Sequence, residues 1–305
     1  MTASAAALAL SGCMPTTALP PSTEPPARAS NATPLPPSPS AESQKLATYY
    51  SRVQKGLLAQ GLLRTDGGGE DTPYTAAQLA ENFRKIALFE EYTNVGGQIV
   101  ARPRASKLHK WDQPIRVGLT FGDGVLPDQQ GRDRRAIDDY VDKLAGATGH
   151  PIEVAFEEPN FHVFVVDEAS RKELGPELER IIPTIDKAAM DTVVNLPRSS
   201  YCLVVGYDPD DDGTYSTAVA VIRAEHPDLL RLSCIHEELA QGLGLSNDSP
   251  AARPSVFNDD EEFALLTRMD EDLLRILYDP RLEPGMTADQ AMPIVRQIAE
   301  ERLDE

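Results

Sequence analysis

The segment CIHEELAQGLGLSND, Cys234–Asp248, is the part of the chain that most strongly indicates a fold and a site. Its spacing matches the metal-binding pattern H-E-x-x-H-x-x-G-x-x-H, but nearly all histidines of that pattern are replaced. One alignment starts at His236 and leaves a single ligand, because Ala240 occupies the second histidine position. The other alignment anchors on Gly244 and places at the three histidine positions Glu237, Gln241 and Asn247.

Helix geometry favours the alignment anchored on Gly244. At about 100° per residue, one apolar stripe is formed by Leu232, Ile235, Leu239 and Leu243. Glu237 and Gln241 lie opposite this stripe and one turn apart, which is the placement that two metal-binding side chains need. Glu238 then occupies the general-base position of the pattern.

The ligand chemistry of this alignment argues against zinc. Catalytic zinc sites use imidazole, thiolate or carboxylate donors, whereas this alignment offers one carboxylate and two amides. Calcium accepts oxygen donors but needs roughly six to eight of them. We therefore expect no cofactor, and leave open a divalent metal ion in a site completed by His236 or another carboxylate, with Asp248 as a further candidate. Taken alone, His236 is expected to be a hydrogen-bonded histidine of the interior.

Around this segment, residues 111–305 are predicted to form an α+β domain. Apolar runs predict strands at residues 114–121, 152–156, 161–166, 201–207 and 216–224. An amphipathic helix is predicted between the first two strands, with one face formed by Ile137, Tyr140, Val141 and Leu144. Residues 168–196 are expected to be a polar helical insertion, and the helix Pro227–Leu243 to end in a turn at Gly244. This order indicates a mixed sheet with helices packed against it.

Residues 42–110 are expected to form a helical hairpin and a connector in front of the main domain. Apolar residues recur at helical spacing over residues 42–92, and the glycine-rich segment TDGGGED, residues 65–71, separates two helices. Residues 94–110 are predicted to be an irregular connector.

The first 41 residues indicate a lipid-anchored protein. Leu10-Ser11-Gly12-Cys13 matches the bacterial lipobox, so residues 1–13 are predicted to be a lipoprotein signal with Cys13 lipidated. No basic residue precedes the short apolar run, which leaves an Ala-rich disordered end with a chance cysteine as the alternative. Residues 14–41 are rich in Pro, Ser and Thr and are expected to be a disordered tether. The expected location is the cell envelope, facing the periplasm, and Met14 after the cysteine favours the outer membrane.

Charge and cysteine content exclude some partners and leave one question open. A formal net charge of −19 argues against nucleic acid and anionic lipid surfaces, because both need a basic footprint. No apolar run approaches the roughly 20 residues that a membrane helix needs. Outside the lipobox, Cys202 and Cys234 remain, and the sequence is compatible both with a disulfide and with two buried thiols.

Two acidic segments are weaker candidates for a functional site. DPDDDG, Asp208–Gly213, opens like a calcium loop, but Val219 occupies the twelfth position, where a bidentate glutamate is needed. An acidic hairpin turn is favoured. NDDEEF, Asn258–Phe263, is expected to be a solvated loop in which Asp259 or Asp260 lies near the presumed cleft.

In sequence order, the site helix, SVFND (Ser255–Asp259) and LTRMDEDLLRILYDP (Leu266–Pro280) resemble the metzincins. In that group, a tight turn under the metal, usually bearing a methionine, and a closing helix follow the site helix. Val256 and Phe257 occupy that turn, with Phe257 where the methionine would be. The closing helix matches at Leu266, Thr267, Asp270, Leu274, Leu277 and Tyr278. The resemblance implies a zincin-like mixed sheet with a site helix and closing C-terminal helices.

Nearly the whole chain after the lipobox also resembles a proteobacterial lipoprotein family catalogued as domain of unknown function 2927. The segments that carry this resemblance are AAQLAENFRKIALFEEY (76–92), HEELAQGLGLSNDS (236–249), SVFNDDEEF (255–263) and LLRILYDPRLEPGM (273–286). The resemblance implies a cell-envelope lipoprotein and carries no established activity.

Two functions from different classes are compatible with these residues. The favoured one is a metal-free zincin-like cleft that binds a peptide or protein partner, with Glu238 accepting hydrogen bonds from a bound strand. The alternative is a divergent metallopeptidase in which Glu238 acts as general base on a water molecule held by Glu237, Gln241 and Asn247.

Overall fold

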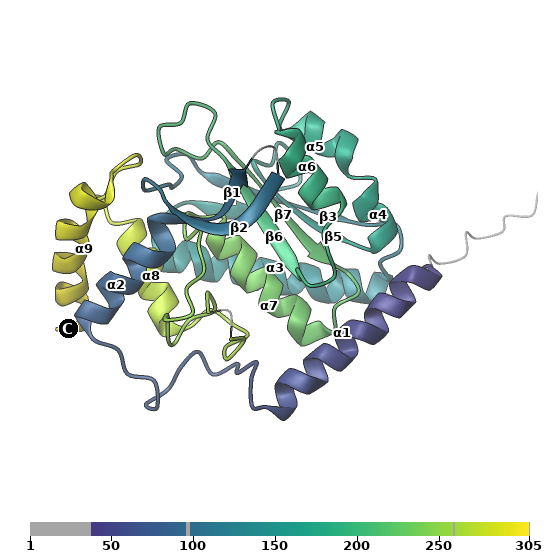
Figure 1. Ribbon diagram of the computed structural model, residues 1–305, viewed down its shortest axis with the longest axis horizontal. Helices are drawn as coiled ribbons and strands as arrows, with labels where there is room; N and C mark the ends of the chain where they lie inside the picture. The colour runs from purple at the N-terminus through teal and green to yellow at the C-terminus, as the bar shows by residue number, and fades with distance from the viewer. Residues whose placement is uncertain (1–37, 96–97, 259, 305) are drawn as a thin grey trace, which may run out of the picture. The chain divides into compact units, whose positions relative to one another are not determined.

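A five-stranded sheet lies at the centre of the computed structural model, which describes residues 38–95, 98–258 and 260–304 (Figure 1). Its strands are β3 (Ile115–Phe121), β4 (Ile152–Val154), β5 (Phe161–Val166), β6 (Cys202–Tyr207) and β7 (Thr217–Arg223). Their order is β4-β3-β5-β7-β6, in which the first four strands are parallel and β6 is an antiparallel edge strand. The predicted mixed sheet is therefore confirmed.

Both faces of this sheet are covered, which explains why its inner strands are continuous apolar runs rather than alternating ones. On β5, Phe161, Val163 and Val165 belong to the larger hydrophobic core, whereas Phe164 and Val166 belong to a smaller one. Successive side chains of a strand point to opposite faces, so one strand contributes to both cores.

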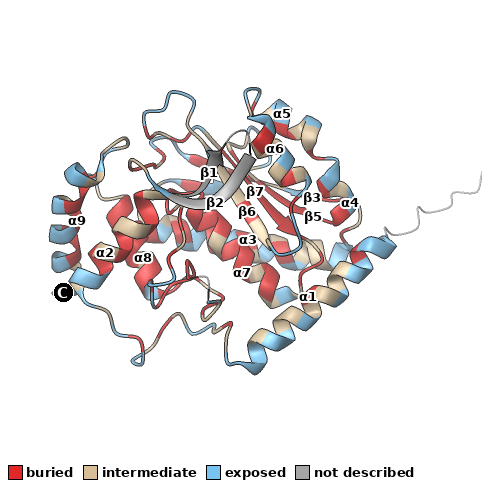
Figure 2. Cartoon of the chain, in the orientation of Figure 1, coloured by how far each residue is buried: buried red, intermediate tan, exposed pale blue. Residues whose placement is uncertain are grey.

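Helices supply the partners for both faces. α3 (Pro127–Thr148) and α7 (Asp228–Gln241) share the larger core, while α5 (Gly175–Ile181) and α6 (Lys187–Val194) share the smaller one and α4 (Glu168–Lys172) contacts β5. Strands β5 and β7 and helix α7 are largely buried, whereas the edge strand β6 is mostly of intermediate exposure (Figure 2). The helical insertion predicted at residues 168–196 corresponds to α4, α5 and α6. The predicted apolar face of α3 is also confirmed, since its four residues are nearly inaccessible to solvent.

The C-terminal helices extend the larger core. α8 (Arg268–Leu277) contacts α3 and α9 (Ala288–Leu303), and α2 (Ala76–Ala87) packs on α9 and α8. α8 begins in a capping box: Thr267 and Asp270 each accept a hydrogen bond from the other's backbone N–H. The closing helix predicted at Leu266–Pro280 is thus present and buries the apolar residues of its motif.

The region before the sheet differs from the prediction. α1 (Ala41–Ala59) packs against α4, so the two helices before the sheet are each held by later parts of the chain. β1 (Phe89–Val95) and β2 (Gln98–Ala105) form an antiparallel pair, where a helix end and an irregular connector are predicted. That prediction is wrong because the sequence TNV-GG-QIV, two β-favouring runs separated by two glycines, is a hairpin signal that outweighs the preceding helical spacing.

Residues 1–37 lie outside the described part of the chain, and with them Cys13 and nearly all of the predicted tether. Within the described residues, none of the helices combines the length and the apolar character that crossing a membrane requires.

Candidate functional site

A cleft of about 340 Å³ lies between the edge strand β6 and helix α7. We call it the α7–β6 cleft. Its described lining consists of Ser199, Ser200, Tyr201, Cys202, Leu203, Val204, Gly206, Tyr215, Glu237, Glu238, Gln241, Ser246, Asp248 and Glu261. No histidine, lysine or arginine is among these lining residues.

The helical wall of the cleft follows from the periodicity of α7. Cys234, Glu237, Glu238 and Gln241 occupy positions i, i+3, i+4 and i+7, so they share one face of the helix. The last three line the cleft. Ile235 and Leu239 lie in the larger core with the residues of the sheet. The structure therefore brings together Glu237, Glu238 and Gln241, with Glu238 only 4% exposed and Glu237 partly exposed.

The end of α7 is shaped by a glycine that the metal-binding pattern shares. Gly244 has a φ of +121°, and a Cβ there would lie 2.1 Å from the carbonyl oxygen of His109. Two side chains donate hydrogen bonds to carbonyl oxygens just after the end of α7. The Trp111 Nε1–H donates to the Gly242 oxygen at 2.8 Å, and the Tyr278 hydroxyl donates to the Leu243 oxygen at 3.0 Å. The chain must turn at Gly244, and the turn carries Ser246 and Asp248 to the cleft.

The strand wall of the cleft comes from alternate residues of β6. Cys202 and Val204 pack toward the larger core, while Leu203 and Val205 pack on the smaller one. Gly206 continues the cleft side, and a Cβ there would lie 2.7 Å from the ring of Tyr215. Sequence reasoning missed this wall, because YCLVVGY is a continuous apolar run and the edge position of β6 is set by strand pairing.

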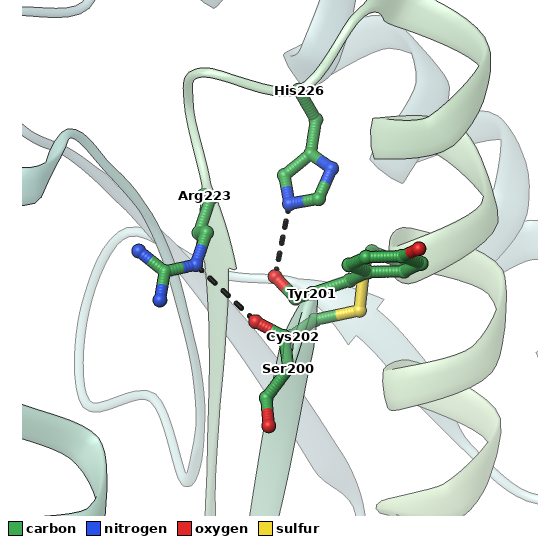
Figure 3. Close-up of a disulfide and its surroundings, with 6 residues drawn as sticks. Ser200, Tyr201, Cys202, Arg223 and His226 are labelled. Atoms are coloured by element: carbon green, nitrogen blue, oxygen red, sulfur yellow. Dashed lines mark hydrogen bonds between the residues drawn. A yellow bond between two sulfur atoms is a disulfide. The ribbon is translucent and has the colours of Figure 1, made fainter. Parts of the chain in front are cut away.

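A disulfide joins the two walls. Cys202 at the start of β6 is bonded to Cys234 on α7, across 32 residues of sequence and a Cα–Cα distance of 5.9 Å (Figure 3). Around it, His226 Nε2 lies 3.0 Å from the Tyr201 carbonyl oxygen, and the Arg223 Nε–H donates to the Ser200 carbonyl oxygen at 3.3 Å. Of the two states that the sequence leaves open for these cysteines, the structure holds the disulfide.

Polar contacts also hold residues that line the cleft. Gln241 donates from Nε2 to Asp248 Oδ1 at 2.9 Å, and the Ser246 hydroxyl donates to the Phe89 carbonyl oxygen at 3.1 Å. Phe89 is the first residue of β1, so a residue that lines the cleft is hydrogen-bonded to the hairpin that sequence reasoning missed.

Asn247 is placed differently from the alignment with the metal-binding pattern. Its side chain donates to the carbonyl oxygens of Lys85, at 2.8 Å, and Asp248, at 2.7 Å, and it is 4% exposed. It does not contribute to the described cleft lining, whereas its neighbour Asp248 does. Gln241 therefore contacts a carboxylate here, because the backbone after Gly244 directs residue 248 inward and uses residue 247 to bind the end of α2.

His236 lies away from the cleft. Its ring stacks on Tyr140 with centroids 3.9 Å apart, and its Nδ1 accepts a hydrogen bond from the Leu266 N–H at 3.1 Å. Burial lowers the pKa of His236 to about 3, so the ring is neutral at physiological pH. These contacts fit a histidine of the interior that helps to hold the start of the closing helix.

The turn that the metzincin resemblance places under the cleft contains a buried hydrogen-bond network centred on Asp270. The Asp270 carboxylate accepts hydrogen bonds from the Ser255 hydroxyl at 2.5 Å, and at 2.9 Å from the N–H groups of Val256 and Thr267 and from the Thr267 hydroxyl. Burial raises the pKa of Asp270 to about 6 in spite of these hydrogen bonds. Val256 and Phe257 are buried in the larger core and are not among the described cleft-lining residues.

The other acidic segments form turns. Asp208 accepts from the N–H groups of Asp212, at 3.2 Å, and Gly213, at 2.7 Å, which is the pattern of an acidic turn. Asp260 accepts from the N–H of Glu262 at 2.9 Å. Asp259 lies outside the described residues. Among the described residues of this loop, Glu261 lines the cleft, and the sequence did not single it out.

The arrangement offers two kinds of chemistry. Carboxylate and amide oxygens of the helix face can accept hydrogen bonds from the backbone or side chains of a bound segment. One metal-compatible group also lies on this wall: Cys202 Sγ and carboxylate oxygens of Glu237 and Glu238 are all within 4.8 Å of one another. In the disulfide state, the sulfur of that group is not a thiolate and cannot serve as an anionic ligand.

The model of the family described as "Protein of unknown function (DUF2927)" matches residues 76–297. The chain belongs to this family. The matched segment runs from the start of α2 into α9, so it includes both walls of the α7–β6 cleft and the hydrogen-bond network around Asp270. No curated protein and no solved structure matches the chain.

Proposed function

We propose that this DUF2927 protein binds an extended peptide segment of a partner protein in the α7–β6 cleft. The observation that carries the proposal is the position of the cleft along an edge strand: among the described strands, β6 pairs only with β7. A strand edge presents backbone N–H and C=O groups that an added strand can pair with. The cleft volume of about 340 Å³ lies at the lower end of the range typical of ligand sites.

The polar face of α7 complements such a ligand. Glu237, Glu238 and Gln241 stand across the cleft from β6, where they would meet the side chains and outer N–H groups of a bound strand. The Cys202–Cys234 disulfide holds the two walls together, so the site is formed before the ligand arrives. A preformed cleft gains affinity because little ordering is needed on binding.

We further propose that this scaffold is a divergent, metal-free relative of the metzincins. The site helix, the buried turn and the closing helix follow one another in the order that the resemblance implies, and Glu238 stands at the cleft wall. Metal-free binding is favoured by the donors: the described lining contains no histidine, and the amide of Gln241 is a poor zinc ligand.

The proposed location is the periplasmic face of the outer membrane, with the chain anchored in the cell envelope by lipid on Cys13. The disulfide supports an oxidising compartment, since disulfides persist there and are rare in the cytosol. Substituting Cys13→Ser should release the protein from the membrane fraction. A variant that still fractionates with membranes would refute the lipid anchor.

The binding proposal is tested by selecting peptides from a random displayed library against the purified protein in its disulfide state. The selected peptides should protect the amides of β6 from hydrogen exchange. Ser200→Trp, which fills the cleft, should abolish binding, while Glu153→Trp on the opposite edge strand β4 should leave it unchanged. Peptides that bind Ser200→Trp as well as the wild type would overturn the proposal.

A metallopeptidase with Glu238 as general base is the second candidate. The observation that favours it is that Glu238 lines the cleft together with Glu237 and Gln241, two residues at ligand positions of the metal-binding pattern. Stoichiometric metal analysis, paired with a proteolysis screen of wild type and Glu238→Gln, separates the two candidates. Near-stoichiometric zinc together with cleavage that disappears in Glu238→Gln would establish the peptidase.

A further inference from the structure

We propose that reduction of the Cys202–Cys234 disulfide turns the helix wall of the α7–β6 cleft into a binding site for one Zn²⁺ ion. Its ligands would be the thiolates of Cys202 and Cys234 and the carboxylates of Glu237 and Glu238. The site goes beyond peptide binding, because it needs no peptide and exists only in the dithiol state.

The spacing of the ligands is that of a metal site on a helix. Cys234, Glu237 and Glu238 occupy positions i, i+3 and i+4 of α7, so all three project from one face. Cys202 faces them from β6, and the disulfide shows that its sulfur reaches that of Cys234. The four side chains come from two elements that are packed against each other, which keeps the ligands in place.

The distances suit zinc after small side-chain rotations. Cys202 Sγ and oxygens of Glu237 and Glu238 lie within 4.8 Å of one another. Tetrahedral zinc, with bonds of about 2.3 Å to sulfur and about 2.0–2.2 Å to oxygen, holds neighbouring donors roughly 3.3–3.8 Å apart. Two sulfurs released from a disulfide separate to about this distance, because they come into van der Waals contact.

Burial and charge favour the ion. Cys234 is 2% and Glu238 4% exposed, while Cys202 and Glu237 are partly exposed and leave a path of entry from the cleft. Two thiolates and two carboxylates supply four anionic donors, which are ligand types that zinc accepts. Thiolate donors select zinc over magnesium and calcium, which prefer oxygen ligands.

The redox step is a thiol–disulfide exchange. A dithiol reductant supplies two electrons and two protons, becomes a disulfide itself, and leaves Cys202 and Cys234 as thiols. Zn²⁺ then displaces the two thiol protons. Because the same sulfurs form either the disulfide or the metal bonds, oxidation and metal binding exclude each other.

The test is an anaerobic Co²⁺ titration of the full chain, reduced with a phosphine that is then removed. Reduced wild type should show thiolate-to-cobalt charge-transfer absorption that saturates at one Co²⁺ per chain and disappears when Zn²⁺ is added. The disulfide form should show no such absorption. Absence of the band in reduced protein that keeps its native near-ultraviolet circular dichroism would overturn the proposal.

Two variants distinguish a zinc site formed by all four ligands from metal binding by the two thiols alone. Glu237→Gln combined with Glu238→Gln should weaken Co²⁺ binding at least ~10-fold, since loss of an outer-shell partner alone typically weakens metal binding by 10- to 100-fold. Asp138→Asn combined with Asp139→Asn, an exposed acidic pair on α3, should leave it unchanged. Equal affinity of wild type and the glutamate variant would overturn the site. So would reduction that unfolds the chain in a way that Zn²⁺ does not reverse.

Discussion

The two ends of α7 carry buried polar residues in contrasting settings. Near the N-terminal end, the Arg231 Nε–H donates to both oxygens of Asp133, at 2.8 and 2.9 Å, and Arg231 is 2% exposed. The backbone oxygen of His226 accepts from the same guanidinium. Toward the C-terminal end, Glu237 and Glu238 line the α7–β6 cleft.

On this one helix, the polar residues near the N-terminal end hold the structure together, and those near the C-terminal end are proposed to bind a ligand. A buried ion pair fixes the position of the helix, because separating its partners leaves a charge without compensation. Carboxylates that line a cleft are expected to contribute less to stability than a buried ion pair, and these two lie where the proposed ligand would bind. The N-terminal end should therefore be sensitive to substitution in stability, and the C-terminal end in binding.

The largest effect is expected from Arg231→Met. The substitution leaves the carboxylate of Asp133 buried without its cation, so the free energy of unfolding should fall by about 3–5 kcal/mol in urea titrations. The matched control, Arg231→Met with Asp133→Leu, should recover most of this loss, because both charges are removed. Equal destabilisation of the single and double variants would show that the ion pair does not hold this end.

The disulfide between the cleft walls should rank second. Replacing both Cys202 and Cys234 by Ser opens a loop that spans 32 residues of sequence and should lower the free energy of unfolding by about 3–4 kcal/mol. A reductant should destabilise wild type by a similar amount and leave the double variant unaffected. A double variant as stable as oxidised wild type would mean that packing alone joins β6 to α7.

A pH dependence should come from His226, which stacks on Tyr50 with ring centroids 4.2 Å apart. Burial lowers the pKa of His226 to about 3 from its ordinary 6.5. Between these values the unfolded chain binds the additional proton, so stability should fall as the pH drops from 6.5 toward 3, by about 1.4 kcal/mol per pH unit. His226→Phe keeps the stacking but cannot titrate, so its unfolding free energy should fall less between pH 6.5 and 5. Parallel pH profiles would contradict the assignment.

The smallest effect on stability is expected at the cleft. Glu237 is partly exposed and its substitution by Gln should change the free energy of unfolding by no more than about 0.5 kcal/mol. The same variant should weaken peptide binding in the disulfide state, as measured with the selected peptides. A loss of stability comparable to that of Arg231→Met would remove the contrast between the two ends of the helix.

Local sequence determined much of this molecule. Strand β5 is where its apolar run predicts it, and α3 and α8 bury the residues that their helical spacing indicates. The same periodicity placed Glu237 and Gln241 opposite the apolar stripe of α7, and both line the cleft. These features depend on the intrinsic period of a helix or strand and on which face is apolar, and both can be counted along the chain.

Tertiary structure decided which polar residues meet. Asn247 and Asp248 are adjacent in sequence, yet the turn after Gly244 uses the first to bind α2 and directs the second to Gln241. The choice depends on the carbonyl of Lys85, which lies 162 positions away in the chain. Spacing alone cannot supply such a contact.

The same holds for the second wall of the cleft and for the disulfide. Cys202 and Cys234 become neighbours because β6 joins the sheet as an antiparallel edge beside α7, an arrangement set by strand pairing across the whole domain. Sequence alone determined which residues are apolar, which are charged and where the helices and strands of the main domain lie, but not the β1–β2 hairpin. Long-range packing selected, among all the carboxylates of an acidic chain, the few that face a cleft, because burial and strand order depend on contacts between distant segments.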